Sequence, residues 1–328
     1  MMEWTKFTVK IGGQDITGHF NPVDGFGSIH VKDTSFSDPS AWILELLPEH
    51  VAIKRIWIEN STFTSFSGLG RFPFLENLWI TSSKIGSMAC VEACTLLKYV
   101  RVVACHLDTM AWMAPLINIE VLDLGKNDII RIEGVAGKQH LRVLALNENK
   151  ITSTAGLKDL PAIKCLSIAK NAIVEVPNPA EMLALIGSCR VPGKANPYAG
   201  GFSDKENPIH EIVQGGTDQP YQPIYMTLYF KQQFERAIPE FKRRLDAGEV
   251  LTMGDVKEAL RLEDGYRAFG YDDFFPKIGY ESIFKAARNA GFEVNAEMIK
   301  VDDNVLFIRK AENSDFDAIF FDVLRRFF

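Results

Sequence analysis

The stretch Leu141-Arg-Val-Leu-Ala-Leu-Asn-Glu-Asn-Lys-Ile151 decides the fold, because its pattern returns every 22 residues along the middle of the chain. Apolar residues occupy its positions 1, 4, 6 and 11, which here are Leu141, Leu144, Leu146 and Ile151. The alternation at positions 4 and 6 indicates a short strand with one buried face. Position 11 is expected to turn inward after that strand.

The repeat runs through six copies without an insertion, and the first position of each copy is apolar: Ile53, Leu75, Leu97, Ile119, Leu141 and Ile163. The ninth position carries a small polar or thiol side chain in every copy: Ser61, Ser83, Cys105, Asn127, Asn149 and Asn171. Such side chains can satisfy backbone groups of turns inside a stack. Because one copy buries its apolar face only against its neighbours, the period predicts a solenoid.

This pattern, LxxLxLxx(N/C)xL, resembles the leucine-rich-repeat family in its 22-residue intracellular class. The last three copies match well, and the first three are looser, with serine or cysteine at the ninth position. The resemblance implies a parallel sheet in an α/β solenoid and a role in binding other proteins. It implies no particular chemistry.

Both ends of the array are expected to carry caps, since a terminal repeat has no neighbour to cover its apolar residues. Residues 29–36 repeat the spacing of residues 56–63 at an offset of 27, which predicts a degenerate earlier copy. Ahead of it, alternation through residues 7–11 and the pair Gly12-Gly13 predict a hairpin. At the other end, residues 179–186 are expected to form a capping helix.

The candidate binding site follows from the strand pattern, because residues beside the inward positions point to the outer, concave sheet face. In the N-terminal half these residues form one predicted patch: Arg55, Trp57, Asn77, Trp79, Tyr99 and Arg101. Tryptophan, tyrosine and arginine dominate interface hot spots. We therefore predict a protein partner here; the alternative is that other parts of the chain cover the patch. In the C-terminal half Asp123, Ala145 and Ser167 are expected to add little.

Residues 178–222 are assigned to the capping helix and a linker, because residues 191–222 hold four prolines and five glycines without periodicity. Residues 223–310 show three helical patterns and then a strand, a turn and a strand, the order of a winged helix-turn-helix. Residues 269–284 also resemble the LOTUS (OST-HTH) branch of that fold, which would imply binding of RNA or of a protein. Residues 311–328 are expected to form an amphipathic helix.

Nucleic-acid contact by this second domain is the alternative function. The cationic and amide side chains that could reach phosphate or a groove are Lys285, Arg288, Asn289, Arg309 and Lys310. The predicted hairpin tip, residues 302–304, is acidic and would repel phosphate. The sequence thus leaves RNA contact and protein docking open for this domain.

Composition narrows the function classes. The 328 residues carry a net charge of −6, so no strongly basic surface for duplex phosphates is expected. The five cysteines form no CxxC pair, which favours reduced thiols in an intracellular protein, cytoplasmic or nuclear. No catalytic motif, metal-ligand spacing or cofactor loop occurs, so no enzyme, metal, cofactor, small-molecule substrate or membrane span is expected.

The sequence therefore predicts an α/β solenoid of leucine-rich repeats with a parallel sheet, plus a small α+β winged-helix-like domain. The expected divisions are residues 1–50 (N-terminal cap), 51–177 (repeats), 178–222 (capping helix and linker), 223–310 (winged-helix-like domain) and 311–328 (C-terminal helix). The predicted function is a non-catalytic adaptor or scaffold subunit of a larger assembly. The alternative is an RNA-binding or RNA-processing subunit.

Overall fold

The structure is a computed structural model that describes residues 5–11, 14–21, 26–33, 35–36, 52–63, 69–70, 72–189 and 201–210, together with scattered residues from 225 to 252 and residues 307–308. The chain divides into two compact units. The first comprises residues 1–177 and 188–209, and the second comprises residues 178–187 and 210–328. The repeats lie in the first unit.

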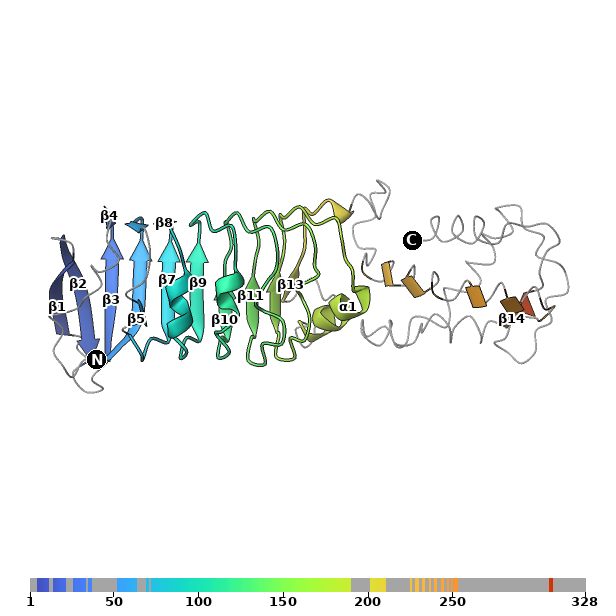
Figure 1. The fold of residues 1–328 in the computed structure, drawn as a ribbon, viewed down its shortest axis with the longest axis horizontal. Helices are drawn as coiled ribbons and strands as arrows, with labels where there is room; N and C mark the ends of the chain where they lie inside the picture. Colours follow the sequence, from blue (N-terminus) through green and yellow to red (C-terminus); the bar gives the residue numbers. More distant parts are fainter. Residues whose placement is uncertain are drawn as a thin grey trace. The chain divides into compact units, whose positions relative to one another are not determined.

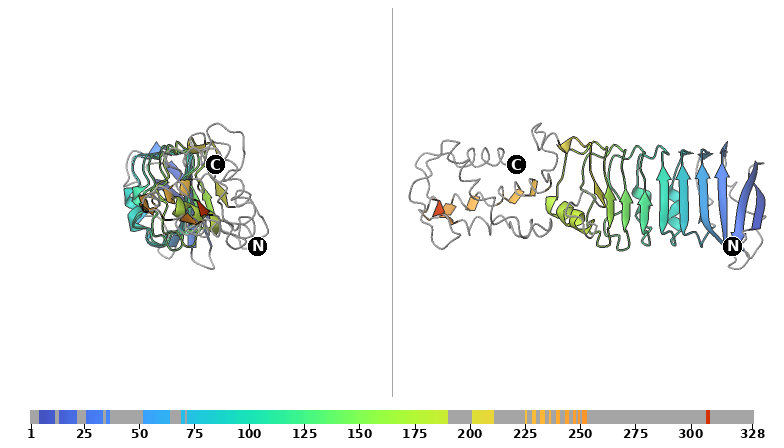
Figure 2. Two further views of the ribbon diagram at one scale, coloured as in Figure 1. Left: turned by 90° about the vertical axis from the view of Figure 1, so that its right-hand side faces the viewer. Right: turned by 180° about the vertical axis from the view of Figure 1, so that it is seen from behind.

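The first unit is built on one ten-stranded sheet, whose strands lie side by side in Figure 1 and in the right-hand view of Figure 2. Its strands, in spatial order, are β1 (Thr5–Ile11), β2 (Gln14–Asn21), β3 (Phe26–Lys32), β5 (Ala52–Glu59), β7 (Asn77–Thr81), β9 (Tyr99–Val103), β10 (Val121–Asp123), β11 (Val143–Ala145), β12 (Cys165–Ser167) and β13 (Phe202–Ser203). The first three strands pair antiparallel, which confirms the predicted hairpin. All later neighbours pair parallel.

Smaller elements outside the main sheet occur in the turns that contain β3, β5, β7 and β9. Three short strands form a second parallel sheet: β4 (Ser35–Phe36), β6 (Thr62–Phe63) and β8 (Lys84–Ile85). Two 3-10 helices, η3 (Ala89–Ala93) and η4 (Ala111–Met113), lie in the turns that contain β7 and β9. The parallel sheet and the stacked turns make this unit a solenoid, as the 22-residue period predicts.

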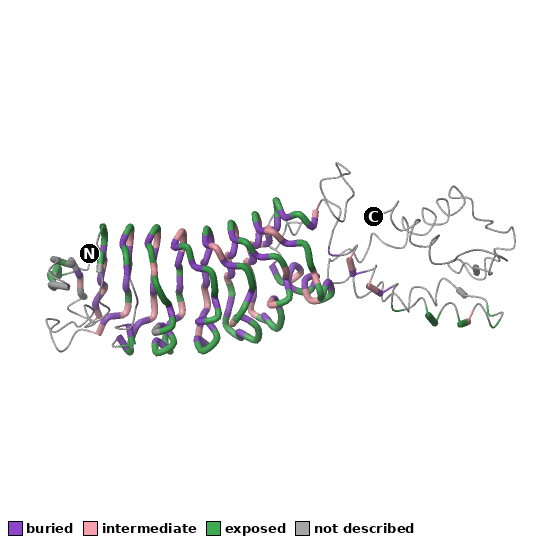
Figure 3. Tube along the Cα trace, turned by 45° about the horizontal axis from the view of Figure 1, so that its top comes forward, coloured by how far each residue is buried: buried purple, intermediate pink, exposed green. Residues whose placement is uncertain are grey.

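The strand register has the period read from the sequence. Leu122 pairs with Leu144 and Leu144 with Leu166, each at an offset of 22 residues. Earlier in the chain Ile29 pairs with Ile56 at the predicted offset of 27, so the strand of the degenerate copy joins the parallel sheet. Buried and exposed residues alternate along the strands (Figure 3), because the inward residues of each turn pack on those of the next.

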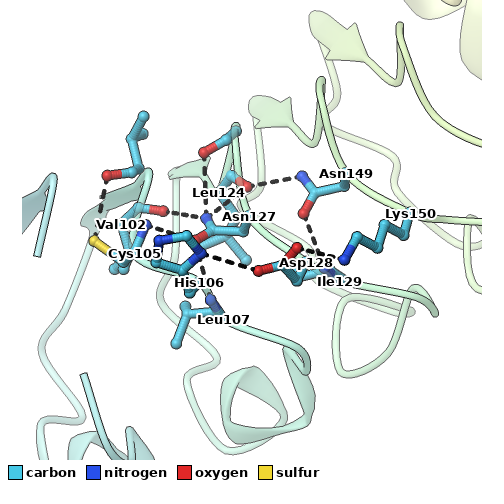
Figure 4. A network of polar contacts seen from close by, with 12 residues as sticks. Val102, Cys105, His106, Leu107, Leu124, Asn127, Asp128, Ile129, Asn149 and Lys150 are labelled. Atoms are coloured by element: carbon cyan, nitrogen blue, oxygen red, sulfur yellow. Dashed lines mark hydrogen bonds and ion pairs between the residues drawn. The ribbon is translucent and has the colours of Figure 1, made fainter. Parts of the chain in front are cut away.

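The ninth repeat position forms a hydrogen-bonded ladder through the stack (Figure 4). The side-chain oxygen of Asn127 accepts from the backbone N–H groups of Cys105 and Leu107, at 3.0 and 3.2 Å. Its amide nitrogen donates to the carbonyl oxygens of Val102 and Leu124, at 2.7 and 2.9 Å. One buried amide thus satisfies backbone groups of two turns, which an apolar side chain could not do.

The residue before each ladder position takes a left-handed backbone conformation. Its φ lies between 45° and 58° in every turn: Asp33, Asn60, Ser82, Ala104, Lys126, Glu148, Lys170 and Glu206. This conformation costs an L-residue about 1–2 kcal/mol, and only glycine adopts it freely. The backbone N–H there bonds to the next turn, as Ala104 N does to the Gly125 carbonyl at 3.2 Å, so stacking offsets the strain.

The stack has one more turn than the sequence analysis expects. Phe202 pairs with Leu166, and Asn207 continues the asparagine ladder by accepting from the Asn171 N–H at 3.2 Å. The linker assignment is therefore wrong for residues 201–210. The predicted helix exists as α1 (Pro179–Ser188), and the chain re-enters the sheet after it as β13.

The second unit is described only in part. The described residues from 225 to 244 are helical, and β14 (Leu251–Thr252) pairs antiparallel with β15 (Phe307–Ile308). Most of the predicted winged-helix-like domain, 223–310, and all of the predicted C-terminal helix, 311–328, lie outside the described residues. Among the helices described, none has both the length and the apolar character to cross a membrane.

Candidate partner-binding face

Strand pairing brings the six predicted site residues together on three neighbouring strands. One row across the sheet holds Arg55, Asn77 and Tyr99, and the next holds Trp57, Trp79 and Arg101. Neighbouring strands lie about 4.8 Å apart, so these side chains form one surface on the outward face of the sheet. We call these six residues the tryptophan face.

The two tryptophans contact each other and remain accessible. Their ring centroids are 5.4 Å apart at an interplanar angle of 80°, the edge-to-face geometry that aromatic pairs prefer. Trp57 and Trp79 keep 44% and 41% of their surface exposed, and Tyr99 keeps 37%. Neither indole N–H has a hydrogen-bond partner among the described residues, so both can donate to a bound molecule.

His30 extends the aromatic row, and the sequence analysis does not include it. It pairs with Trp57 across β3 and β5, and the two ring centroids are 4.9 Å apart at 32°. Its Nε2 lies 3.8 Å from Glu59 Oε2. The degenerate copy contained the signal, because His30 stands between Ile29 and Val31 as Trp57 stands between Ile56 and Ile58.

Charges on and beside the tryptophan face are mostly paired. Arg101 Nε lies 3.2 Å from Asp123 Oδ2, and Lys54 Nζ lies 3.2 Å from Glu76 Oε1. Among the described residues, Arg55 and Lys98 have no ion-pair partner. The cations left over on this part of the sheet are therefore Arg55, which is exposed, and Lys98, which is half-buried.

An apolar edge adjoins the tryptophan face where the strands begin. Phe74, Leu96 and Ile117 are exposed in the turns that lead into β7, β9 and β10. They stand at the last two positions of their repeats, where later copies have His140 and Ala162. We call these three residues the strand-start edge. This edge was not predicted, because its residues lie outside the strand positions of the repeat.

The C-terminal half of the same face is plain. Asp123, Ala145 and Ser167 continue the tryptophan row onto β10, β11 and β12 as half-buried, small or acidic side chains. Asp123 is held by Arg101. Bulky exposed groups on the sheet face are thus concentrated on the turns that contain β5, β7 and β9.

A charged cluster lies in the turns after β9, β10 and β11 (Figure 4). Asp128 Oδ1 lies 2.7 Å from Lys150 Nζ, and Asp128 Oδ2 lies 3.2 Å from His106 Nδ1. These hydrogen bonds, that from Lys150 first, lower the pKa of Asp128. His106 is exposed, and exposed pairs of this kind add little stability.

The remaining site predictions cannot be placed. The candidate nucleic-acid contacts Lys285, Arg288, Asn289, Arg309 and Lys310 lie outside the described residues. Within the described part, no group of three or more His, Cys, Asp and Glu side chains is arranged to hold a metal ion. The cysteines described there, Cys94, Cys105, Cys165 and Cys189, are free.

Comparison with known proteins returns structural neighbours alone. No protein-family model matches the chain, and no curated protein matches it significantly. An internalin (inlF) from Listeria monocytogenes is similar at 16% identity and a TM-score of 0.44, over 54% of this chain and 55% of the internalin. Internalin C2 (inlC2) from Listeria monocytogenes is similar at 20% identity and a TM-score of 0.40, over 44% of this chain and 62% of the other.

The LRR ectodomain of the receptor kinase SOBIR1 from Arabidopsis thaliana is also similar, at 14% identity and a TM-score of 0.27, over 62% of this chain and 78% of that ectodomain. The chain thus spans less than two thirds of the length of either internalin.

Proposed function

We propose that this protein is a non-catalytic adaptor or scaffold subunit that binds a protein partner through the tryptophan face. One observation carries the proposal: Trp57 and Trp79 pack edge to face on adjacent strands, yet each exposes more than two fifths of its surface. Exposed patches of this kind mark contact sites, and tryptophan and arginine contribute most to interface energies.

The experiment that tests the proposal is affinity capture from an extract of the source organism, treated with nuclease. The wild-type chain and the double variant Trp57→Ala with Trp79→Ala are compared by quantitative mass spectrometry. We expect one or a few proteins to be enriched on the wild type and lost on the variant, because truncating a central interface tryptophan costs about 2–4 kcal/mol of binding.

The matched control is Ile130→Ala with Val174→Ala, which truncates two exposed apolar residues away from the sheet strands. This control should retain the captured proteins. Equal capture by the tryptophan variant would show that the binding face lies elsewhere. A large loss of stability in that variant would show that other parts of the chain cover the tryptophans.

The finer predictions remain part of this proposal. They are membership of the 22-residue intracellular class, a place in a larger intracellular assembly, and a winged-helix-like domain of LOTUS type at residues 223–310. Free thiols on the four described cysteines support a reducing compartment.

The alternative function, RNA binding by the second domain, rests on its sequence. It predicts that Lys285→Glu with Arg288→Glu abolishes binding of the full chain to RNA at low salt, where phosphate attraction is strongest. Equal RNA affinity of wild type and variant in a gel-shift titration would remove this helix from consideration. No RNA binding by the wild type would remove the alternative for this domain.

A further inference from the structure

The charges and exposed side chains around the tryptophan face point to the chemistry of its partner. We propose that it binds an acidic protein segment that carries bulky apolar side chains. Arg55 and Lys98 bind the carboxylates of this segment, while its apolar side chains rest on the Trp57–Trp79 pair and the strand-start edge. This inference rests on the proposed function, since it names the partner of the same face.

The sign of the partner's charge follows from the ion pairs. Lys54 is neutralised by Glu76, Lys32 lies 3.8 Å from Glu59, and Arg101 is held by Asp123. Among the described residues, neither Arg55 nor Lys98 forms an ion pair. Glu120, which stands at the repeat position of Lys98 in the next turn, is also without an ion pair in this part of the chain, so one positive charge remains in excess. Residues 51–176 as a whole hold 14 Lys and Arg against 11 Asp and Glu, although the full chain is acidic. The unmatched charge on this surface is therefore positive, and a complementary partner brings carboxylates.

The two unmatched cations stand among the exposed apolar groups. Arg55 lies two residues before Trp57 on β5 and pairs across the sheet with Asn77. Lys98 lies between Leu96 of the strand-start edge and Tyr99 of the tryptophan face. Alternate residues of a strand are about 7 Å apart, so one bound segment can place a carboxylate on a cation and an apolar side chain on the adjacent aromatic. A carboxylate that an arginine holds beside apolar surface is partly desolvated, which strengthens the contact.

The ring geometry favours a protein over a single-stranded nucleic acid. Bases stack on open aromatic faces. The His30 ring lies 4.9 Å from the Trp57 ring at 32°, and Trp57 and Trp79 meet edge to face at 5.4 Å, so His30 already occupies a place against Trp57 where a base would stack. The exposed apolar residues Phe74, Leu96 and Ile117 offer contacts to side chains, and two of them are aliphatic.

The experiment uses a phage-displayed library of random 12-residue peptides as the probe. The full chain is the bait, and recovered peptides are synthesised and titrated by fluorescence anisotropy. We expect enrichment of Asp or Glu together with Trp, Phe, Leu or Ile. We expect at least tenfold weaker binding to Arg55→Glu with Lys98→Glu, and weaker binding of the wild type when NaCl is raised from about 50 to about 500 mM.

Two further variants serve as controls for this binding experiment. Arg142→Glu is the matched control, because Arg142 occupies the same repeat position as Lys98 two turns later and is exposed. It should bind the peptides as the wild type does. Arg55→Gln with Lys98→Gln removes the charges without reversing them and should weaken binding in the same direction, which excludes a folding defect of the glutamate variant as the cause.

Each other outcome contradicts the inference in a distinguishable way. Peptides that lose affinity for Trp57→Ala with Trp79→Ala but keep it for the charge variants leave the face in place and overturn the acidic partner. Peptides unaffected by either double variant overturn both the face and its partner. Enrichment of basic sequences, or of none, overturns the acidic partner. A 20-nucleotide single-stranded RNA that binds more tightly than the peptides, and depends on the same residues, overturns the choice of a protein.

Discussion

The stack has two regions that are built from the same repeat but differ in their outward face. The earlier region comprises the turns that contain β5, β7 and β9, and the later region comprises the turns that contain β10, β11 and β12. The earlier turns have strands of eight, five and five residues with serine or cysteine in the ladder, and their outward face is aromatic. The later turns have strands of three residues each, an asparagine in every ladder position and a plain outward face. Because inward and outward positions alternate, the same backbone can vary its surface while its core is kept.

The hydrogen bonds made by the ninth repeat position differ between the two regions. Ser83 Oγ accepts from the Ser61 N–H at 3.0 Å and donates to the Thr81 carbonyl at 2.8 Å. Asn149 accepts from the Ile129 N–H at 3.1 Å and donates to the carbonyls of Leu124 and Leu146, at 2.9 and 3.0 Å. An asparagine ties its own turn to the preceding ones with more bonds than a serine. We infer that the later turns contribute more to stability and the earlier ones more to binding.

The largest expected effect tests what the two regions share. Leu78→Ala in β7 and Leu144→Ala in β11 each remove a fully buried inward side chain. Each should lower the free energy of unfolding by about 2–5 kcal/mol, because a cavity opens between turns that stack on each other. Urea unfolding measures both. A wild-type midpoint for either variant would contradict the register of that region.

The second expected effect separates the two regions. Asn149→Ala should cost about 3 kcal/mol, because it leaves the buried Ile129 N–H without a partner and removes one of the two side-chain hydrogen bonds that each of the Leu124 and Leu146 carbonyls accepts. Ser83→Ala should cost about 1 kcal/mol, since fewer bonds are lost. The same urea series measures the difference. Equal losses would remove the distinction between the asparagine turns and the serine turns.

A smaller effect concerns the cysteine at the boundary between the regions. Burial raises the pKa of the Cys105 thiol from 9.0 to about 11. The unfolded chain loses this proton first, so the thiol's contribution to stability is present below pH 9 and is lost as the pH rises toward 11. The variant Cys105→Ser has the residue of the two preceding turns and lacks this thiol. Between pH 8 and pH 10.5 the free energy of unfolding of the wild type should therefore fall by about 1–2 kcal/mol more than that of the variant. Parallel pH dependence of the two unfolding midpoints would contradict the assignment.

Much of the first unit could be predicted because its period is strict. The 22-residue spacing of Ile53, Leu75 and Leu97 sets which residues face inward, and that decides which residues pair across the sheet. The strand pairing sets the six residues of the tryptophan face in two rows across three neighbouring strands, and their role as a binding site remains a prediction. The strand-start edge lies outside the strand pattern and was missed for that reason.

Two features could not be predicted from the 22-residue period. One is a turn that follows an insertion, and the other is a lysine that is buried at an otherwise apolar position. The turn at residues 201–210 follows an insertion that contains α1, which stretches the spacing from Leu166 to Phe202 to 36 residues. Lys138 stands in a row that is otherwise apolar, at the position of Leu116 and Leu160. Its ammonium group is nevertheless buried, because it donates to the Met113 and Ala114 carbonyls, each at 2.8 Å.

The most direct test of the account is one paired measurement on Trp57→Ala with Trp79→Ala: its urea midpoint and its affinity for the captured partner. We expect the partner to be lost, while the loss of unfolding free energy stays below half that of Leu144→Ala, because both side chains project from the outward face. The urea midpoint of the variant should therefore stay close to that of the wild type, whereas its affinity for the partner should fall. A variant that keeps its partner, or that unfolds as easily as Leu144→Ala, would contradict the division between a binding region and a stabilising region.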